Sequence, residues 1–162
     1  MNKLSLTLLL ACLSVSAQAA PTDTIQTPSE NPYIQQQIGV KLQFGRLETE
    51  NSQLILHPDN HISRSKSDQL CWRVTLDNRW QKQQVFSVFA SPKGATFTFP
   101  NVKVDSNADK TRHQLSTSLQ PDSKGLFQQC WKFDSRDLLG DYSLMLRIGD
   151  KQFAPFNFIV TP

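Results

Sequence analysis

The chain has 162 residues, of which 38% are hydrophobic and 19% carry a charge, and its formal net charge is +3. So small a positive charge, without any block of like charges, does not indicate a nucleic-acid-binding or membrane-surface protein, and we expect no nucleic-acid partner. The length is sufficient for one domain with a hydrophobic core.

Residues 1–19 have the pattern of a secretory signal peptide. Lys3 precedes an apolar run over 4–15, and Ala17-Gln18-Ala19 matches an A-x-A cleavage site. The apolar run is too short to span a bilayer, so we expect a periplasmic or secreted mature chain without a transmembrane segment. Residues 9–12 also loosely resemble a lipobox, which leaves a lipid-modified Cys12 as an alternative.

Residues 20–37 are rich in Pro, Thr, Gln and Ser and sparse in apolar side chains. A segment of this composition cannot bury enough apolar surface to fold by itself, so we predict a flexible N-terminal segment. We expect residues 38–162 to form a single β-sandwich domain, for the reasons that follow.

Apolar residues alternate with polar ones along most of residues 38–162, which is typical of half-buried β-strands because successive side chains point to opposite faces. This alternation predicts eight or nine short strands, over 38–44, 53–57, 70–76, 85–90, 97–104, 113–119, 127–133, 142–148 and 156–160. The run 85–90 is apolar on both parities, which indicates either a central strand buried on both faces or a strand whose register stays open.

Short strands separated by turn residues, without an amphipathic helix, predict an all-β fold. Their spacing favours an antiparallel immunoglobulin-like β-sandwich over a small barrel. Gly149 tolerates a positive φ and marks a tight hairpin before the last strand. Pro155 lacks a backbone donor, which indicates that the last strand is an edge strand. The proline either protects this edge from pairing, which we favour, or leaves it for a partner to pair with.

Cys71 and Cys130 are the two cysteines expected in the mature chain, and an even pair in an oxidising compartment predicts a disulfide. Each precedes a tryptophan, Trp72 or Trp131, so cysteine and tryptophan point to opposite faces of a strand. Apolar residues share the parity of the tryptophans, which places the indoles in the core. The disulfide then joins two strands of one sheet on its outer face, whereas an immunoglobulin disulfide joins two sheets. The alternative is an exposed indole platform for sugars.

Two groups of residues have partial metal-binding patterns. His57 and His61 have the i, i+4 spacing that binds a metal on a helix, but a proline between them disfavours a helix. Asp105, Asn107 and Asp109 match the opening of a calcium loop, which then lacks the glycine at position six and the glutamate at position twelve. We therefore expect no tight metal site and no cofactor.

The C-terminal third resembles the end of a family of small exported bacterial β-sandwich domains of unknown function. The resemblance rests on Trp131-Lys132-Phe133, Leu139-Gly140-Asp141-Tyr142-Ser143-Leu144 and Phe158-Ile159-Val160, with Phe44-Gly45 in the first strand. It implies a periplasmic sandwich and no established activity. The two Cys-Trp pairs are not part of the family pattern.

The sequence contains no nucleophile elbow, no free cysteine for a Cys–His pair and no glycine-rich phosphate loop. We therefore predict a non-enzymatic binding or interaction module of the bacterial envelope, whose partner is a protein or an envelope component. Two alternatives stay open. One is a small hydrolase or metal-dependent enzyme with a site built from loops, and the other is a carbohydrate-binding sandwich.

Overall fold

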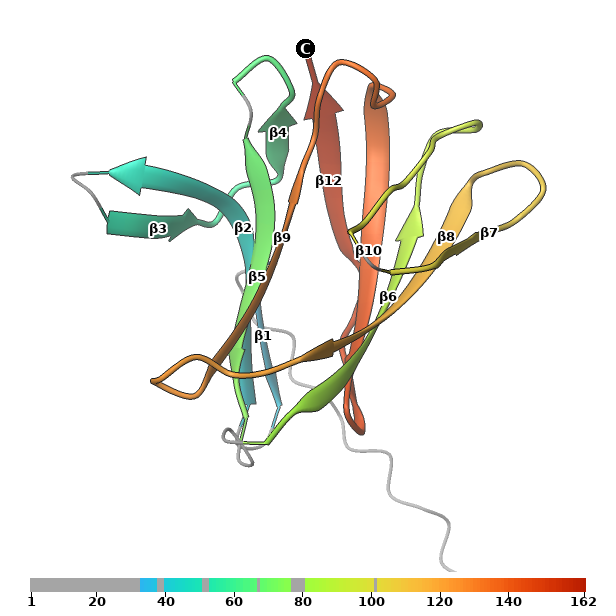
Figure 1. Ribbon diagram of the computed structural model, residues 1–162. Coiled ribbons are helices and arrows are strands. Elements are labelled where there is room, and N and C mark those ends of the chain that lie inside the picture. Colours follow the sequence, from blue (N-terminus) through green and yellow to red (C-terminus); the bar gives the residue numbers. More distant parts are fainter. Residues whose placement is uncertain (1–32, 38–39, 51–52, 67, 77–80, 101) are drawn as a thin grey trace, which may run out of the picture.

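A computed structural model describes residues 33–37, 40–50, 53–66, 68–76, 81–100 and 102–162. The predicted signal peptide, Cys12 and most of the predicted flexible segment lie outside these residues. The described chain forms twelve strands in two sheets that face each other (Figure 1). No helix in this part of the chain is long and apolar enough to cross a membrane.

The first sheet has the strand order β1-β2-β5-β9, and β3 pairs with the second half of β2. All its pairs are antiparallel. Its strands are β1 (Ile34–Gln37), β2 (Val40–Glu50), β3 (Gln53–His57), β5 (Gln69–Thr75) and β9 (Leu126–Lys132). Because β2 is 11 residues long, it continues beyond β5 and forms a hairpin with β3.

The second sheet has the order β4-β12-β10-β6-β8-β7, with β11 paired to β10. The pair of β4 and β12 is parallel, and the other pairs are antiparallel. Its strands are β4 (His61–Ser63), β6 (Gln83–Ala90), β7 (Val104–Ser106), β8 (Arg112–Leu119), β10 (Gly140–Ile148), β11 (Lys151–Gln152) and β12 (Phe156–Thr161). Gly149 has a φ of 59° in the turn between β10 and β11.

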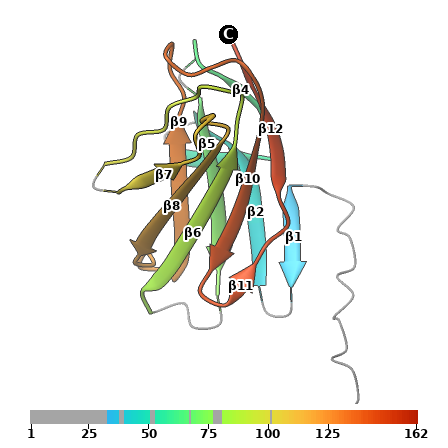
Figure 2. The ribbon, with the colours of Figure 1, turned by 90° about the vertical axis from the view of Figure 1, so that its right-hand side faces the viewer.

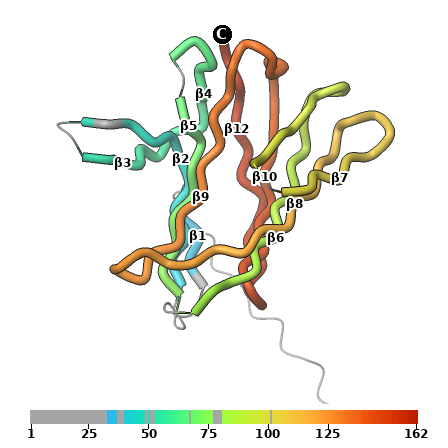
Figure 3. The backbone as a smooth tube through the Cα atoms, viewed as in Figure 1, coloured from blue at the N-terminus to red at the C-terminus, as the bar shows by residue number. Residues whose placement is uncertain are grey.

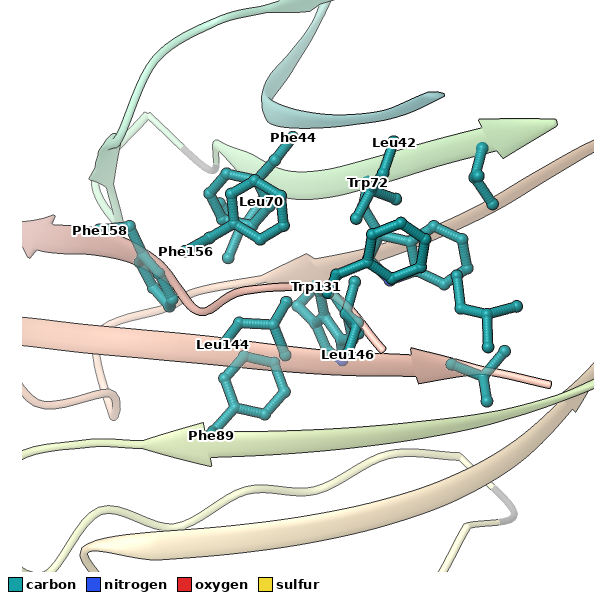
Figure 4. Packing of buried hydrophobic residues seen from close by; sticks show 14 of the residues in the cluster. Leu42, Phe44, Leu70, Trp72, Phe89, Trp131, Leu144, Leu146, Phe156 and Phe158 are labelled. Carbon is teal, nitrogen blue, oxygen red and sulfur yellow. The ribbon is translucent and has the colours of Figure 1, made fainter. Parts of the chain in front are cut away.

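One hydrophobic core lies between the two sheets, built from the alternate residues that each strand turns inward (Figure 4). Aromatic rings from both sheets meet in it. Phe44 of β2 stacks on Phe156 of β12 with ring centroids 4.3 Å apart, and Phe89 of β6 meets Trp131 of β9 edge-on at 5.0 Å. Such pairs add to the stabilisation that burial of their apolar surface supplies.

The predicted sandwich is confirmed, but the strand count and some boundaries were wrong. β1 lies in the segment predicted to be flexible, where IQQQ carries no alternation to identify a strand. The strand predicted to start at Phe97, with a break at Pro100, does not form: the described residues there have only a Phe99–Val102 bridge, and β7 starts at Val104. The ambiguous run 85–90 has a single buried face: Phe89 is buried, while Phe86 lies on the outer face under the Arg147 guanidinium.

Candidate functional site

One lateral edge of the sandwich is open. Within the described residues, the backbone of β9 pairs with β5 on one side and with no strand on the other. In the facing sheet β7 pairs with β8 only as far as Leu115, so residues 116–119 of β8 have a free edge as well. Figure 2 shows β9, β8 and β7 on the same side of the molecule. The two sheets thus present free strand edges to each other.

A groove runs along these free edges, made of two adjoining pockets of about 540 and 510 Å³. We call it the β9 groove. Phe99, Pro100 and Cys130 line both pockets. The first pocket is completed by Thr96, Phe97, Thr98, Trp131, Lys132, Phe133, Asp134, Arg136 and Asp137, and the second by Val102, Ser116, Thr117, Ser118, Leu119, Gln128 and Gln129. Apolar and aromatic walls with a few polar groups are typical of ligand sites.

Three buried polar atoms belong to residues that line the β9 groove. Thr117 Oγ1, Gln129 Oε1 and Trp131 Nε1 make no hydrogen bond to any described residue. The three residues are only 9%, 6% and 7% exposed. A buried polar atom without a partner costs about 1–3 kcal/mol, so a ligand that bonds to these atoms would recover free energy on binding.

Charged residues form the rim of the first pocket. Arg136 donates to Asp134 and, together with its backbone N–H, holds the pKa of that carboxyl at about 2. The pKa of Asp137 shifts in the other direction, because burial raises it. Asp137 Oδ2 also accepts the Asp134 N–H at 2.6 Å, which fixes the loop after β9. The rim is therefore rigid and, with Lys132 exposed beside it, offers charges of both signs.

The prediction that the last strand is the outermost strand of its sheet was wrong. β10 covers one side of β12, and β4 pairs with Ile159, Val160 and Thr161 on the other. Gln35 of β1 bonds to the backbone of Ala154, just before β12. This side of β12 is therefore partly covered, whereas within the described residues β9 has no second strand along its whole length.

The predicted disulfide between Cys71 and Cys130 is confirmed, as is its position. The two cysteines are directly opposed in β5 and β9 of one sheet, and they point away from the core face that holds Trp72 and Trp131. Both indoles are buried, so the exposed sugar-stacking platform was wrong. The end of β3 covers this outer face. Gly45 lies opposite Cys71, and a Cβ atom on Gly45 would overlap the carbonyl oxygen of His57.

The segment that matches the opening of a calcium loop uses its side chains in other ways. Asp105 pairs with Lys103 at 2.7 Å, and Asp109 with Lys93 at 3.5 Å. Asn107 Oδ1 accepts the backbone N–H groups of Thr111 and Arg112, at 2.8 and 3.0 Å, and so fixes the β7–β8 turn. The expectation that this loop holds no tight calcium site stays a prediction.

His57 and His61 do not combine into one ligand set among the described residues. His57 Nε2 faces Glu48 and Glu50, whereas His61 Nδ1 lies 3.5 Å from Asp59. The spacing that suggested a histidine pair belongs to a helix, and this segment is the end of one strand, a loop and the start of the next.

A family model for the PM0630 beta sandwich domain matches residues 42–161. The chain belongs to this family. An uncharacterized protein from Pasteurella multocida (strain Pm70) is 28% identical over 103 residues, which are 61% of this chain and 64% of that protein. The chain therefore matches just under two thirds of the length of this relative.

A solved immunoglobulin-like protein from Pseudomonas aeruginosa has the same fold. It superposes with a TM-score of 0.50 at 16% sequence identity, over 74% of this chain and 91% of that one. Membership of the PM0630 family and this likeness agree on an immunoglobulin-like β-sandwich of unknown function, as the C-terminal motifs predicted. Their names state no activity.

Proposed function

We propose that this protein is an exported, non-enzymatic binding module that takes up an extended peptide segment of a partner protein in the β9 groove. The observation that carries the proposal is the free edge of β9 beside a groove whose lining includes three residues, each with a buried, unpartnered polar atom. An unpaired strand offers alternating N–H and C=O groups, which an added strand satisfies.

The groove suits a peptide in strand conformation. The segment would lie between β9 and residues 116–119 of β8, with its backbone bonded to a strand edge. Its alternate side chains would fill the two pockets, against Phe97 and Phe99 in the first and Leu119 in the second. Main-chain pairing supplies affinity in this mode, and the pockets supply specificity.

Export is the second part of the proposal. Residues 1–19 have the regions of a secretory signal peptide. The Cys71–Cys130 disulfide agrees with an oxidising compartment, since such bonds are rare in the cytosol. Fractionation of the native host, with mass spectrometry of the N-terminus, tests this part. A cytosolic protein that retains residues 1–19 would contradict it.

Peptides selected from a random library against the protein test the binding mode. Gln129→Leu and Thr117→Val keep the side-chain size but remove the unpartnered acceptors. Because those acceptors are buried without a partner, both variants should be as stable as the wild type or more stable. If the peptide bonds to these atoms, each variant should bind it about two- to tenfold more weakly. Loss of affinity with gain of stability excludes misfolding as the cause.

The matched control is Thr75→Val, which makes the same change at an exposed position of β5. It should leave peptide affinity unchanged. Hydrogen exchange gives the second readout, because strand addition should slow the exchange of amides in β9. The proposal fails if no selected peptide binds, or if bound peptides neither protect β9 nor respond to Gln129→Leu and Thr117→Val.

A further inference from the structure

The β2–β3 hairpin projects from the body of the sandwich, as Figure 3 shows. Three side chains that can ligate a metal gather on it: Glu48 and Glu50 of β2, and His57 at the end of β3. Their ligand atoms all lie within 4.8 Å of one another. None of these residues lines the β9 groove, so the cluster is separate from the proposed peptide site.

Two distances inside the cluster are short enough for one cation to bridge the atoms. His57 Nε2 lies 2.8 Å from Glu50 Oε1 and 3.4 Å from Glu48 Oε2. Zinc binds imidazole nitrogen and carboxylate oxygen at about 2.0–2.2 Å, so ligand atoms around a tetrahedral ion are roughly 3.3–3.6 Å apart. The His57–Glu48 distance lies within this interval, and the His57–Glu50 contact would lengthen by about 0.5 Å when the ion binds.

The imidazole nitrogen is the second observation. His57 Nε2 is buried and makes no hydrogen bond to a described residue, although 32% of the His57 side chain is exposed. Glu50 Oε1 lies 2.8 Å from it, a contact that is an ion pair only when the ring is protonated. A buried nitrogen in this state is costly, and a cation placed between it and the two carboxylates would satisfy it.

Arg46 positions one ligand from outside the set. Its guanidinium pairs with Glu48 Oε1, which leaves Glu48 Oε2 facing His57. Arg46 Nε donates to Asp59 Oδ2 at 3.2 Å, and Asp59 Oδ1 accepts the His61 N–H at 2.9 Å. Outer contacts of this kind orient the ligating carboxylates of metal sites and strengthen metal binding.

We propose that Glu48, Glu50 and His57 bind a divalent transition-metal ion of the zinc class. One imidazole and two carboxylates suit Zn²⁺, whereas Ca²⁺ takes oxygen ligands only and needs six or more. Three protein ligands are one fewer than a closed tetrahedral site has, so one position is open to water or to a donor from a partner.

Zinc titration of the full chain, freed of any affinity tag, tests the site by calorimetry. We expect one Zn²⁺ per chain, and Co²⁺ in its place should give the visible absorption of a bound ion. Glu50→Gln and His57→Gln should each lower the affinity at least about tenfold. Glu50 lies on the exposed hairpin, with 45% of its side chain accessible, so Glu50→Gln keeps the fold. Arg46→Gln, a change outside the ligand set, should weaken binding about 10- to 100-fold.

His61→Gln is the matched control, since His61 lies close by and is 62% exposed but faces Asp59. It should bind Zn²⁺ as the wild type does. Absence of saturable Zn²⁺ binding overturns the proposal, as does equal binding by Glu50→Gln and the wild type. Peptide affinity at the β9 groove is measured on the same variants and should not change, so the failure of one proposal is distinguishable from failure of the other.

Discussion

The side-chain amide of Gln35 makes two hydrogen bonds with the backbone of Ala154, 119 residues further along the chain. Gln35 Nε2 donates to the Ala154 carbonyl at 2.8 Å, and Gln35 Oε1 accepts the Ala154 N–H at 2.7 Å. A primary amide has the same kinds of donor and acceptor as a peptide group. The Gln35 side chain therefore satisfies the backbone N–H and C=O of Ala154 as a neighbouring strand would. It ties β1 of the first sheet to the segment before β12 of the second.

Replacing Gln35 by Leu should destabilise the domain, because both hydrogen bonds are lost. Two such bonds together contribute about 1–3 kcal/mol to the free energy of unfolding. Urea unfolding followed by fluorescence measures the difference. Gln36→Leu is the control, since Gln36 is exposed in the same strand. Equal effects of the two substitutions would show that the Gln35–Ala154 bonds do not stabilise the fold.

Removing the disulfide should have a larger effect. Cys71 and Cys130 are 59 residues apart, and a bridge across a loop of that length stabilises by about 4 kcal/mol, chiefly by restricting the unfolded chain. The Cys71→Ala, Cys130→Ala double variant should therefore lose most of the margin of a typical domain. Chemical unfolding of the variant and of the oxidised wild type gives the difference. A loss below about 1 kcal/mol would contradict the entropic account.

The features that the sequence predicted depend on a pattern of period two. Trp72 and Trp131 share the parity of core residues, which placed the indoles inward and the cysteines outward without knowledge of the strand order. The run around Phe86 and Phe89 lacks that pattern, because Phe86 is apolar on the outer face, where Arg147 covers it. Only the pairing with β8 and β10 settled its register.

The candidate sites could not be predicted in the same way, because they join residues distant in the sequence. His57 meets Glu48 and Glu50 only through the pairing of β3 with β2. For the β9 groove a signal did exist. Gln129 and Thr117 are polar residues at core-facing positions of β9 and β8. Polar residues at such positions indicate a ligand or a buried network, but they do not show which strand edges are free.

Tyr142 at the start of β10 donates its hydroxyl to the carbonyl of Leu138, four residues earlier, at 2.8 Å. This contact resembles the tyrosine corner of immunoglobulin-like sandwiches. Tyr142→Phe should lower the free energy of unfolding at neutral pH by about 1 kcal/mol. Urea unfolding measures it, and a variant as stable as the wild type would contradict this role.

The ionisation of the Tyr142 phenol should make the stability of the domain depend on pH under alkaline conditions. Burial, with the Asp137 carboxylate nearby, raises the pKa of Tyr142 to about 12. The unfolded phenol ionises near pH 10. The folded state therefore holds its proton more tightly, and this contribution to stability declines as the pH rises from about 10 to 12. Tyr142→Phe should show a smaller decline over that window, and an unchanged decline would count against the assignment.

His113 of β8 should make stability depend on pH on the acid side. Its ring is buried, stacked on Phe97 with centroids 4.4 Å apart, and its nitrogens lie 2.8 and 3.0 Å from the hydroxyls of Ser106 and Ser91. Burial lowers the pKa of His113 below its ordinary value of 6.5, with a smaller effect in the same direction from the Lys110 charge. Both serines can donate or accept, so they suit the neutral ring.

The direction of the pH dependence follows from the difference in the pKa of His113 between the unfolded and the folded state. Between its unfolded pKa near 6.5 and its lower folded pKa, His113 is protonated in the unfolded state and neutral in the folded one. Its contribution to stability is therefore complete above about pH 6.5 and is lost progressively as the pH falls through that window. Urea unfolding at about pH 7.5 and 5.5 should show the wild type losing stability. His113→Gln cannot titrate at this position, so its loss should be smaller. Equal losses in the two proteins would exclude His113 as the group responsible.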